Sequence, residues 1–188
     1  MSLFDFTFSL MAVILGLALT QIAASLHKLL LSGRRTKWAP EPLLLALLVT
    51  MVIVVLWLTA WSDRAETSVG YWPILMRVLA LLILYFTAAS CLPEVKAGTE
   101  PIETYVYYDR TRRFSFGSLI VSYSIGSTLD LLSHDLVFHG ILSVLLWLLY
   151  PALYAALMFI RARWFNIAGL SFAISLLGLG ALDFKISA

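Results

Sequence analysis

The sequence is poor in charge and in cysteine. Only 13% of its 188 residues are charged, whereas an average soluble domain is about 25% charged. The formal net charge is +2, and a balance so close to zero gives no basis for a nucleic-acid partner. The single cysteine, Cys91, excludes an internal disulfide and any metal site built of cysteines alone. These absences exclude a disulfide-stapled scaffold and argue against a soluble fold.

Signatures of common catalytic and nucleotide-binding sites are also missing. The sequence has no HExxH, no GxSxG, no P-loop and no dinucleotide fingerprint. We therefore predict no catalytic residue and no cofactor, and a membrane enzyme ranks last among the functions considered. His134, Asp135 and His139 are the one candidate metal cluster, because histidine and carboxylate groups bind Zn or Cu. Their spacing matches no standard site, so no metal is predicted.

What the sequence does contain is long apolar runs. Hydrophobic residues make up 61% of the chain, the mean hydropathy is +0.93, and a membrane span needs about 20 mostly apolar residues. The runs predict an all-α, polytopic membrane helix bundle that forms one transmembrane domain over residues 1–188. Six spans are expected, at residues 6–30, 42–61, 71–91, 114–133, 138–160 and 164–184. Residues 92–113 are expected to form the one long connection.

The loop charges predict the orientation of these spans, because cytoplasmic loops carry an excess of Lys and Arg. Six spans place ten basic residues on one side: Lys28, Arg34, Arg35, Lys37, Lys96, Arg110, Arg112, Arg113, Arg161 and Arg163. The other side has Arg64, Arg77 and Lys185. Both termini are therefore predicted to lie outside, on the periplasmic face, with three basic loops in the cytoplasm.

The fourth predicted span carries a stripe of small and polar residues. At about 100° per residue, the members fall within roughly 120° of one another; they are Ser115, Ser118, Ser122, Gly126, Asp130 and Ser133. A carboxylate on such a stripe should not face lipid. Arg77 of the third span is expected at a similar depth. It can pair with Asp130, or it can extend to the outer headgroups, which its long stem allows.

Two further sets of small residues predict close helix packing. The first span has a ladder with a spacing of four, and the sixth span has a similar face. Small residues at such spacing let helix backbones approach closely. The two sets are Ala12, Gly16, Thr20 and Ala24, and Ser171, Ser175 and Gly178.

The opening segment, FDFTFSLMAVILGLALTQIAASLHKLLLSGRRTKW, resembles the start of small uncharacterised multi-span proteins found in bacterial genomes. The resemblance covers mainly the first span and its basic exit. It implies a bacterial inner-membrane protein, and it supplies no activity and no functional residues. The order of the spans adds the hypothesis of a 3+3 inverted repeat, in which each half has an odd number of spans and the halves have opposite orientation.

Two functions remain open at this stage. In the first, the protein is a small channel or transporter for an ion or polar solute, with the stripe lining the path and Asp130 as a cation or proton site. In the second, it is a non-catalytic scaffold or accessory subunit, and the same stripe is a packing face. The expected partners are the lipid bilayer and either a second copy or another membrane protein. The sequence does not specify a substrate.

Overall fold

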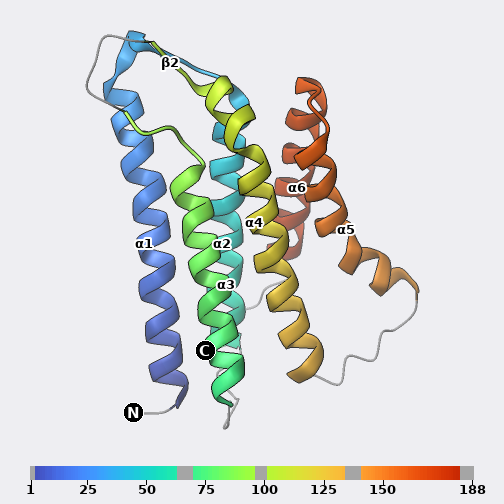
Figure 1. The fold of residues 1–188 in the computed structure, drawn as a ribbon. Coiled ribbons are helices and arrows are strands. Elements are labelled where there is room, and N and C mark those ends of the chain that lie inside the picture. The colour runs from blue at the N-terminus through green and yellow to red at the C-terminus, as the bar shows by residue number, and fades with distance from the viewer. Residues whose placement is uncertain (1–2, 63–69, 96–100, 134–140, 183–188) are drawn as a thin grey trace.

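The structure, a computed structural model, is an antiparallel helix bundle (Figure 1). It describes residues 3–62, 70–95, 101–133 and 141–182. The described helices are α1 (Leu3–Leu31), α2 (Pro40–Ser62), α3 (Tyr71–Ser90), α4 (Thr104–Ser133), α5 (Ile141–Phe159) and α6 (Arg163–Leu182). A 3₁₀ turn η1 (Gly33–Arg35) and two short strands, β1 (Thr36–Lys37) and β2 (Ile102–Glu103), complete the described elements. The prediction of an all-α bundle is confirmed.

Four of the described helices are long and apolar enough to cross a membrane. The qualifying segments are Thr7–Leu31, Pro40–Trp61, Tyr71–Ser90 and Arg163–Ala181. Helix α5 contributes a shorter apolar stretch, Trp147–Phe159. A membrane-spanning protein is therefore supported by length and composition, while the count of six spans stays a prediction.

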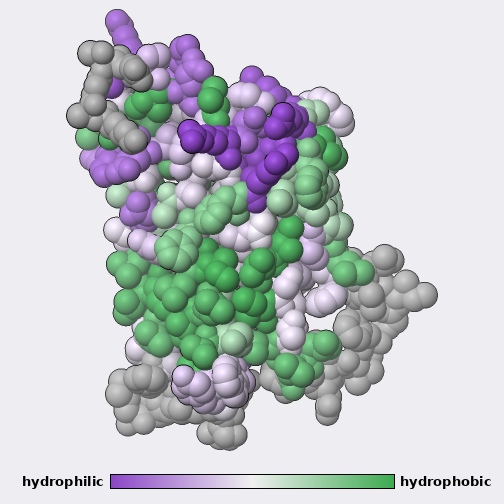
Figure 2. Space-filling model, in the orientation of Figure 1, coloured by the Kyte–Doolittle hydropathy of each residue, from purple (hydrophilic) through white to green (hydrophobic). Residues whose placement is uncertain are grey.

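The surface of the bundle fits this interpretation. Large apolar side chains on the outside of the helices are exposed, Val13 and Phe86 among them. Soluble monomeric proteins rarely expose large contiguous apolar surfaces. On the face that Figure 2 shows, apolar residues form a belt across the middle of the molecule and hydrophilic residues are concentrated at one end. That end holds the α1–α2 and α5–α6 connections and the start of α4 (Figure 1). We call it the basic end, because it carries nine described basic residues: Lys28, Arg34, Arg35, Lys37, Arg110, Arg112, Arg113, Arg161 and Arg163.

The helices pack around one apolar core. Helix α3 packs against α1 and α4, α2 packs against α6, and α4 packs against α5. Fully buried side chains from α2, α3, α4, α5 and α6 meet in the core, including Leu48, Leu84, Phe116, Leu157 and Leu170. Helices α2 and α6, which are far apart in sequence, thus lie side by side and join the two halves of the chain.

The start of α4 differs most from the sequence expectation. The helix begins at Thr104, so part of the predicted connection 92–113 is helical and not loop. Charge excluded this segment from the membrane, but charge does not exclude a helix. Tyr108, Arg112 and Ser115 are buried at intervals of four and three residues, while Arg110 and Arg113 are exposed. This spacing is that of an amphipathic helix that packs by one face beyond the apolar belt.

Candidate functional site

The first half of the predicted stripe on α4 packs against α3. Ser118 Oγ lies 2.7 Å from Thr87 Oγ1, and the Ser122 hydroxyl donates to the Ala80 carbonyl at 3.0 Å. Ser115 Oγ lies 3.4 Å from Ser90 Oγ. Ser115, Ser118 and Thr87 are buried. We call these contacts the α3–α4 seam.

Hydroxyl groups in the seam have partners within the protein. Ser118 Oγ is also within hydrogen-bond distance of the Phe114 and Ser115 carbonyls, at 2.8 Å and 3.0 Å, and Thr87 Oγ1 donates to the Ile83 carbonyl at 3.0 Å. Hydroxyls in membrane helices commonly bond to their own backbone in this way. The hydroxyls of Ser118 and Thr87 therefore need no water as hydrogen-bond partner, and helices α3 and α4 are in direct contact at the seam.

Further along α4 the stripe reaches a cavity of about 380 Å³. It lies among α2, α3, α4, α5 and α6, in the half of the bundle away from the basic end. Ser122, Gly126 and Ser127 line it from α4. A Cβ atom added to Gly126 would meet nothing within 4 Å, which places this glycine against open space. Ser122 and Gly126 of the stripe thus face a hollow, whereas Ser115 and Ser118 face helix α3.

The cavity wall is mostly apolar and carries a group of hydroxyls. Its apolar side chains include Val52, Leu56 and Leu84. The hydroxyls belong to Thr59, Ser122, Tyr123, Ser127, Tyr150 and Tyr154. None of the residues described as lining this cavity is charged. Its size lies near the lower end of the range of about 300–1,000 Å³ found for small-molecule sites.

A side pocket of about 100 Å³ adjoins the cavity and brings in Arg77. The two spaces share Leu56, Thr59, Ser122 and Gly126, so the half-buried Arg77 lies next to the main cavity. The side chains of Asp130 and Ser133 lie outside the described residues, and the predicted Arg77–Asp130 pair therefore stays a prediction. His134, Asp135 and His139 also lie outside the described residues, and no metal-binding cluster occurs in the part that the structure describes.

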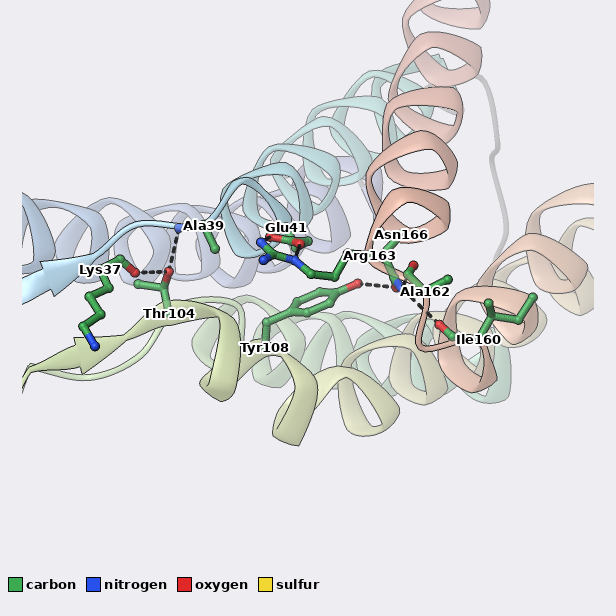
Figure 3. A network of polar contacts seen from close by, with 9 residues as sticks. All are labelled: Lys37, Ala39, Glu41, Thr104, Tyr108, Ile160, Ala162, Arg163 and Asn166. Atoms are coloured by element: carbon green, nitrogen blue, oxygen red, sulfur yellow. Dashed lines mark hydrogen bonds and ion pairs between the residues drawn. The ribbon is translucent and has the colours of Figure 1, made fainter.

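The basic end is closed by a network of polar contacts that we call the clamp (Figure 3). At its centre, Arg163 at the start of α6 donates from Nε to Glu41 Oε1 at 2.7 Å and from Nη2 to Oε2 at 3.4 Å. Glu41 is fully buried in the first turn of α2, where the helix dipole favours a carboxylate. The Arg163 guanidinium also lies 4.3 Å from the centre of the Tyr105 ring. This contact joins α2, α4 and α6.

A second part of the clamp holds the α5–α6 turn. The buried Tyr108 hydroxyl donates to Asn166 Oδ1 at 2.9 Å, and Asn166 Nδ2 donates to the Ile160 and Ala162 carbonyls. Arg112 Nη1 also donates to the Ile160 carbonyl at 2.9 Å. The Ile160 carbonyl follows the end of α5, where backbone acceptors lack helical partners and a cation is favoured. The Ala162 carbonyl also accepts the backbone N–H of Asn166 at 3.1 Å, in the first turn of α6. Burial raises the pKa of the Tyr108 phenol, so the group stays a hydrogen-bond donor.

The third part of the clamp ties the α1–α2 connection to α4. The backbone N–H of Ala39 donates to Thr104 Oγ1, which in turn donates to the Lys37 carbonyl, both at 2.9 Å. Strands β1 and β2 pair in parallel beside it, and Lys37 Nζ lies 2.6 Å from Glu103 Oε1. The left-handed backbone of Gly33, with φ of 56°, turns the chain from α1 towards β1.

A column of aromatic rings connects the clamp to the cavity. From Tyr108 the rings run to Phe116, Tyr154, Tyr150 and Tyr123, with successive centroids 6.5, 6.3, 6.2 and 5.9 Å apart. The first three are buried in the core, and the last three line the cavity. The rings join α4 and α5, so a movement of α5 would be transmitted to both the clamp and the cavity.

The two predicted packing faces are used differently inside the chain. On α1, Gly16, Thr20 and Ala24 are exposed, and the buried face instead includes Leu15 and Ala18. The ladder as a helix-packing face stays a prediction.

On α6, Ser171 and Ser175 are exposed, and the Ser175 hydroxyl bonds back to the Ser171 carbonyl. Gly178 approaches α2, because an added Cβ would lie 3.8 Å from Met51. The tightest approach is at Gly169, where an added Cβ would lie 2.8 Å from Leu157 Cδ2.

Sequence reasoning missed the clamp and the tyrosine-lined cavity. Glu41 and Arg163 are 122 residues apart, and no local pattern joins them. The one usable signal was the spacing of Tyr105, Tyr108 and Arg112, which is helical. No protein-family model, curated protein or solved structure matches the chain.

Proposed function

We propose that this protein is a carrier for a small solute in a bacterial plasma membrane and that the cavity is its binding site. The observation that carries the proposal is the contrast between the two halves of the bundle. One half is hollow, and the other is closed by ionic and hydrogen-bonded contacts. A carrier needs a site that communicates with one side of the membrane while the other side is shut.

The orientation follows from charge. The basic end faces the cytoplasm, because basic residues are retained on that side, and both termini lie outside. The cavity then belongs to the periplasmic half of the protein. The proposed topology has six spans, arranged as a 3+3 inverted repeat in which the two halves have opposite orientation in the membrane.

The solute path differs from the one that the stripe alone indicated. The α3–α4 seam is closed by contacts between Ser118 and Thr87, so this part of the stripe contributes packing. Ser122 and Gly126 line the cavity, and among the described side chains of the stripe these two belong to the path. Opening towards the cytoplasm would require the clamp to break. Pro151 lies inside α5 between the cavity-lining Tyr150 and Tyr154, where it removes one helical hydrogen bond and makes bending easier.

Thiol labelling in intact cells tests the proposal. Cys91 is replaced by alanine, and single cysteines are introduced as Gly126→Cys, Ser127→Cys and Ser118→Cys. A membrane-impermeant maleimide added from outside should label the first two positions. Ser118→Cys is the matched control, because this residue lies on the same helix but is buried against α3. Unreactive cysteines at both cavity positions would contradict a cavity open to water.

The second candidate is a non-catalytic scaffold or accessory subunit. It is favoured by the seam, in which the serines of α4 have protein partners. A scaffold predicts that all three introduced cysteines stay unreactive from both sides. It also predicts that Asp130→Asn lowers stability or assembly, whereas the carrier mechanism with Asp130 as an ion or proton site predicts loss of flux in a folded protein.

A further inference from the structure

The cavity contains hydrogen-bonding groups that the protein itself does not use. Tyr123 donates its hydroxyl to the Trp147 carbonyl at 3.0 Å, and Thr59 donates to the Val55 carbonyl at 3.0 Å. Among the described residues, by contrast, the hydroxyls of Tyr150, Tyr154 and Ser127 have no hydrogen-bond partner. The two tyrosines are neighbours on α5, with ring centroids 6.2 Å apart.

Tyr154 is the most informative of these residues. Only 3% of it is exposed, and its ring packs on Phe116 with centroids 6.3 Å apart. Its hydroxyl is not among the polar atoms sealed within the protein without a partner, so it reaches the cavity that the residue lines. A buried hydroxyl without a hydrogen bond costs free energy. Fixed in this position, it is suited to donate to an acceptor on a bound molecule.

We propose that the cavity binds a neutral, mainly apolar molecule with a carbonyl oxygen, and that this oxygen accepts a hydrogen bond from Tyr154. Three features define the class. The aliphatic wall selects for apolar surface, and the aromatic side chains of Tyr150 and Tyr154 in the same wall suit a flat or unsaturated ring system. None of the described residues that line this cavity is charged, and the nearby Arg77 belongs to the wall of the side pocket, so an ionic ligand would have no counter-ion in the cavity wall itself.

This inference rests on the proposed function, because it takes the cavity to be the solute site. It replaces an ion or polar solute by a lipophilic one, which can reach the cavity from the membrane as well as from water. A hydrocarbon without a polar atom would fill the same space but leave the Tyr154 hydroxyl unbonded. The carbonyl is therefore the group whose contribution can be measured.

The test compares two probes that differ only at that group, 2-acetylnaphthalene and 2-ethylnaphthalene. Binding to the full chain in lipid nanodiscs is measured by equilibrium dialysis, with binding to empty nanodiscs subtracted. The ratio of the two affinities is compared between the native protein and Tyr154→Phe, so that the different membrane partitioning of the probes cancels. One neutral hydrogen bond should change this ratio about 3- to 10-fold.

Two variants make the result specific to the hydroxyl. Tyr123→Phe is the matched control, because its ring also lines the cavity while its hydroxyl is already bonded to a backbone carbonyl; it should keep the preference for the ketone. Tyr150→Phe/Tyr154→Phe should lose the preference completely. Both substitutions retain the aromatic rings and hence the packing with Phe116.

Each outcome decides the question. A preference for the ketone that Tyr154→Phe abolishes supports the inference. A preference that persists in Tyr154→Phe, or equal binding of both probes by the native protein, overturns it. If Gly126→Cys is labelled but neither probe binds, the ligand class is wrong and the carrier proposal stands. If Gly126→Cys and Ser127→Cys are also unreactive, both proposals fail.

Discussion

Arg163 and Glu41 form an ion pair in which the two partners have very different surroundings. The Glu41 side chain is 0% exposed, whereas 56% of the Arg163 side chain is exposed. The carboxylate is fixed inside the first turn of α2, and the guanidinium reaches it from the surface while also lying over Tyr105. Movement of Arg163 alone would therefore open this part of the clamp and leave a buried carboxylate behind.

Removal of the guanidinium should destabilise the bundle. Arg163→Ala leaves the buried Glu41 carboxylate without its charged partner, and an unpaired buried charge is destabilising. Thermal unfolding of the purified protein should show the loss. Arg163→Ala/Glu41→Gln should recover part of it, because the buried group is then neutral.

The control for this prediction is Arg161→Ala. Arg161 is basic and exposed two residues earlier in the same connection, and surface charges contribute about 0–1 kcal/mol. If Arg161→Ala costs as much as Arg163→Ala, the effect would reflect the net charge of the basic end and not the ion pair.

Tyr108 should make the protein sensitive to alkaline pH. Burial raises the pKa of its phenol, and the nearby Arg112 acts in the opposite direction. Below the ordinary tyrosine pKa of about 10 the group is protonated in both the folded and unfolded states. As the pH rises through 10, the unfolded chain ionises first, so stability is lost progressively up to the higher pKa of the folded state.

Thermal unfolding between pH 8 and pH 11 measures this effect. Tyr108→Phe should cost about 1 kcal/mol at pH 8 through the lost bond to Asn166, and its stability should fall less steeply above pH 10. Parallel pH profiles for the two proteins would contradict a buried, protonated phenol in the clamp.

Gly169 should resist substitution. An added Cβ would lie 2.8 Å from Leu157 Cδ2, and Leu157 is completely buried, so Gly169→Ala forces the α5–α6 contact apart. Overpacking of this kind costs about 1–3 kcal/mol. Gly16→Ala is the control, because it has the same gain in helix propensity and meets nothing within 4 Å. Equal unfolding temperatures for the two variants would show that α5 and α6 lie further apart.

The seam should respond as packing and not as a solute path. Ser118→Ala and Thr87→Val each remove a hydroxyl from one interhelical hydrogen bond, and such bonds contribute about 0.6 kcal/mol on average in a membrane protein. The double variant should lose less than the sum of the two, since both changes remove the same contact. Ser175→Ala, at an exposed position on α6, should leave stability unchanged. Additive losses would argue that the two hydroxyls do not interact.

The sequence predicted the helices well because apolar runs of membrane length leave little choice of secondary structure. Five of the expected spans agree with the described helices to within three residues at each end. The early start of α4 was missed, because Arg110, Arg112 and Arg113 exclude the membrane but permit an amphipathic helix. The stripe was also only half informative: periodicity shows which residues share a face, but not whether that face meets α3 or a cavity.

The clamp and the cavity could not be predicted for a different reason. Both are made by residues from several helices, such as Glu41, Arg163 and Tyr154, and one sequence has no information on which helices become neighbours. Individually, each of these residues has an ordinary alternative role: Glu41 at a helix start and Arg163 at a membrane boundary are common in exposed positions. The contact between Glu41 and Arg163 depends on the packing of α2 against α6.

The long sequence separation between Glu41 and Arg163 also has a consequence for biosynthesis. Ala39 and Thr104 are 65 residues apart, so their contact can form before α5 and α6 are made. Glu41 must wait for a residue 122 positions later, which takes about 6–24 s at usual rates of translation. During that interval the nascent chain has a carboxylate without its cation. In a chain truncated before α6, the Glu41 carboxylate would never meet its cation. Helix α6 therefore supplies the charge that neutralises the buried carboxylate of α2.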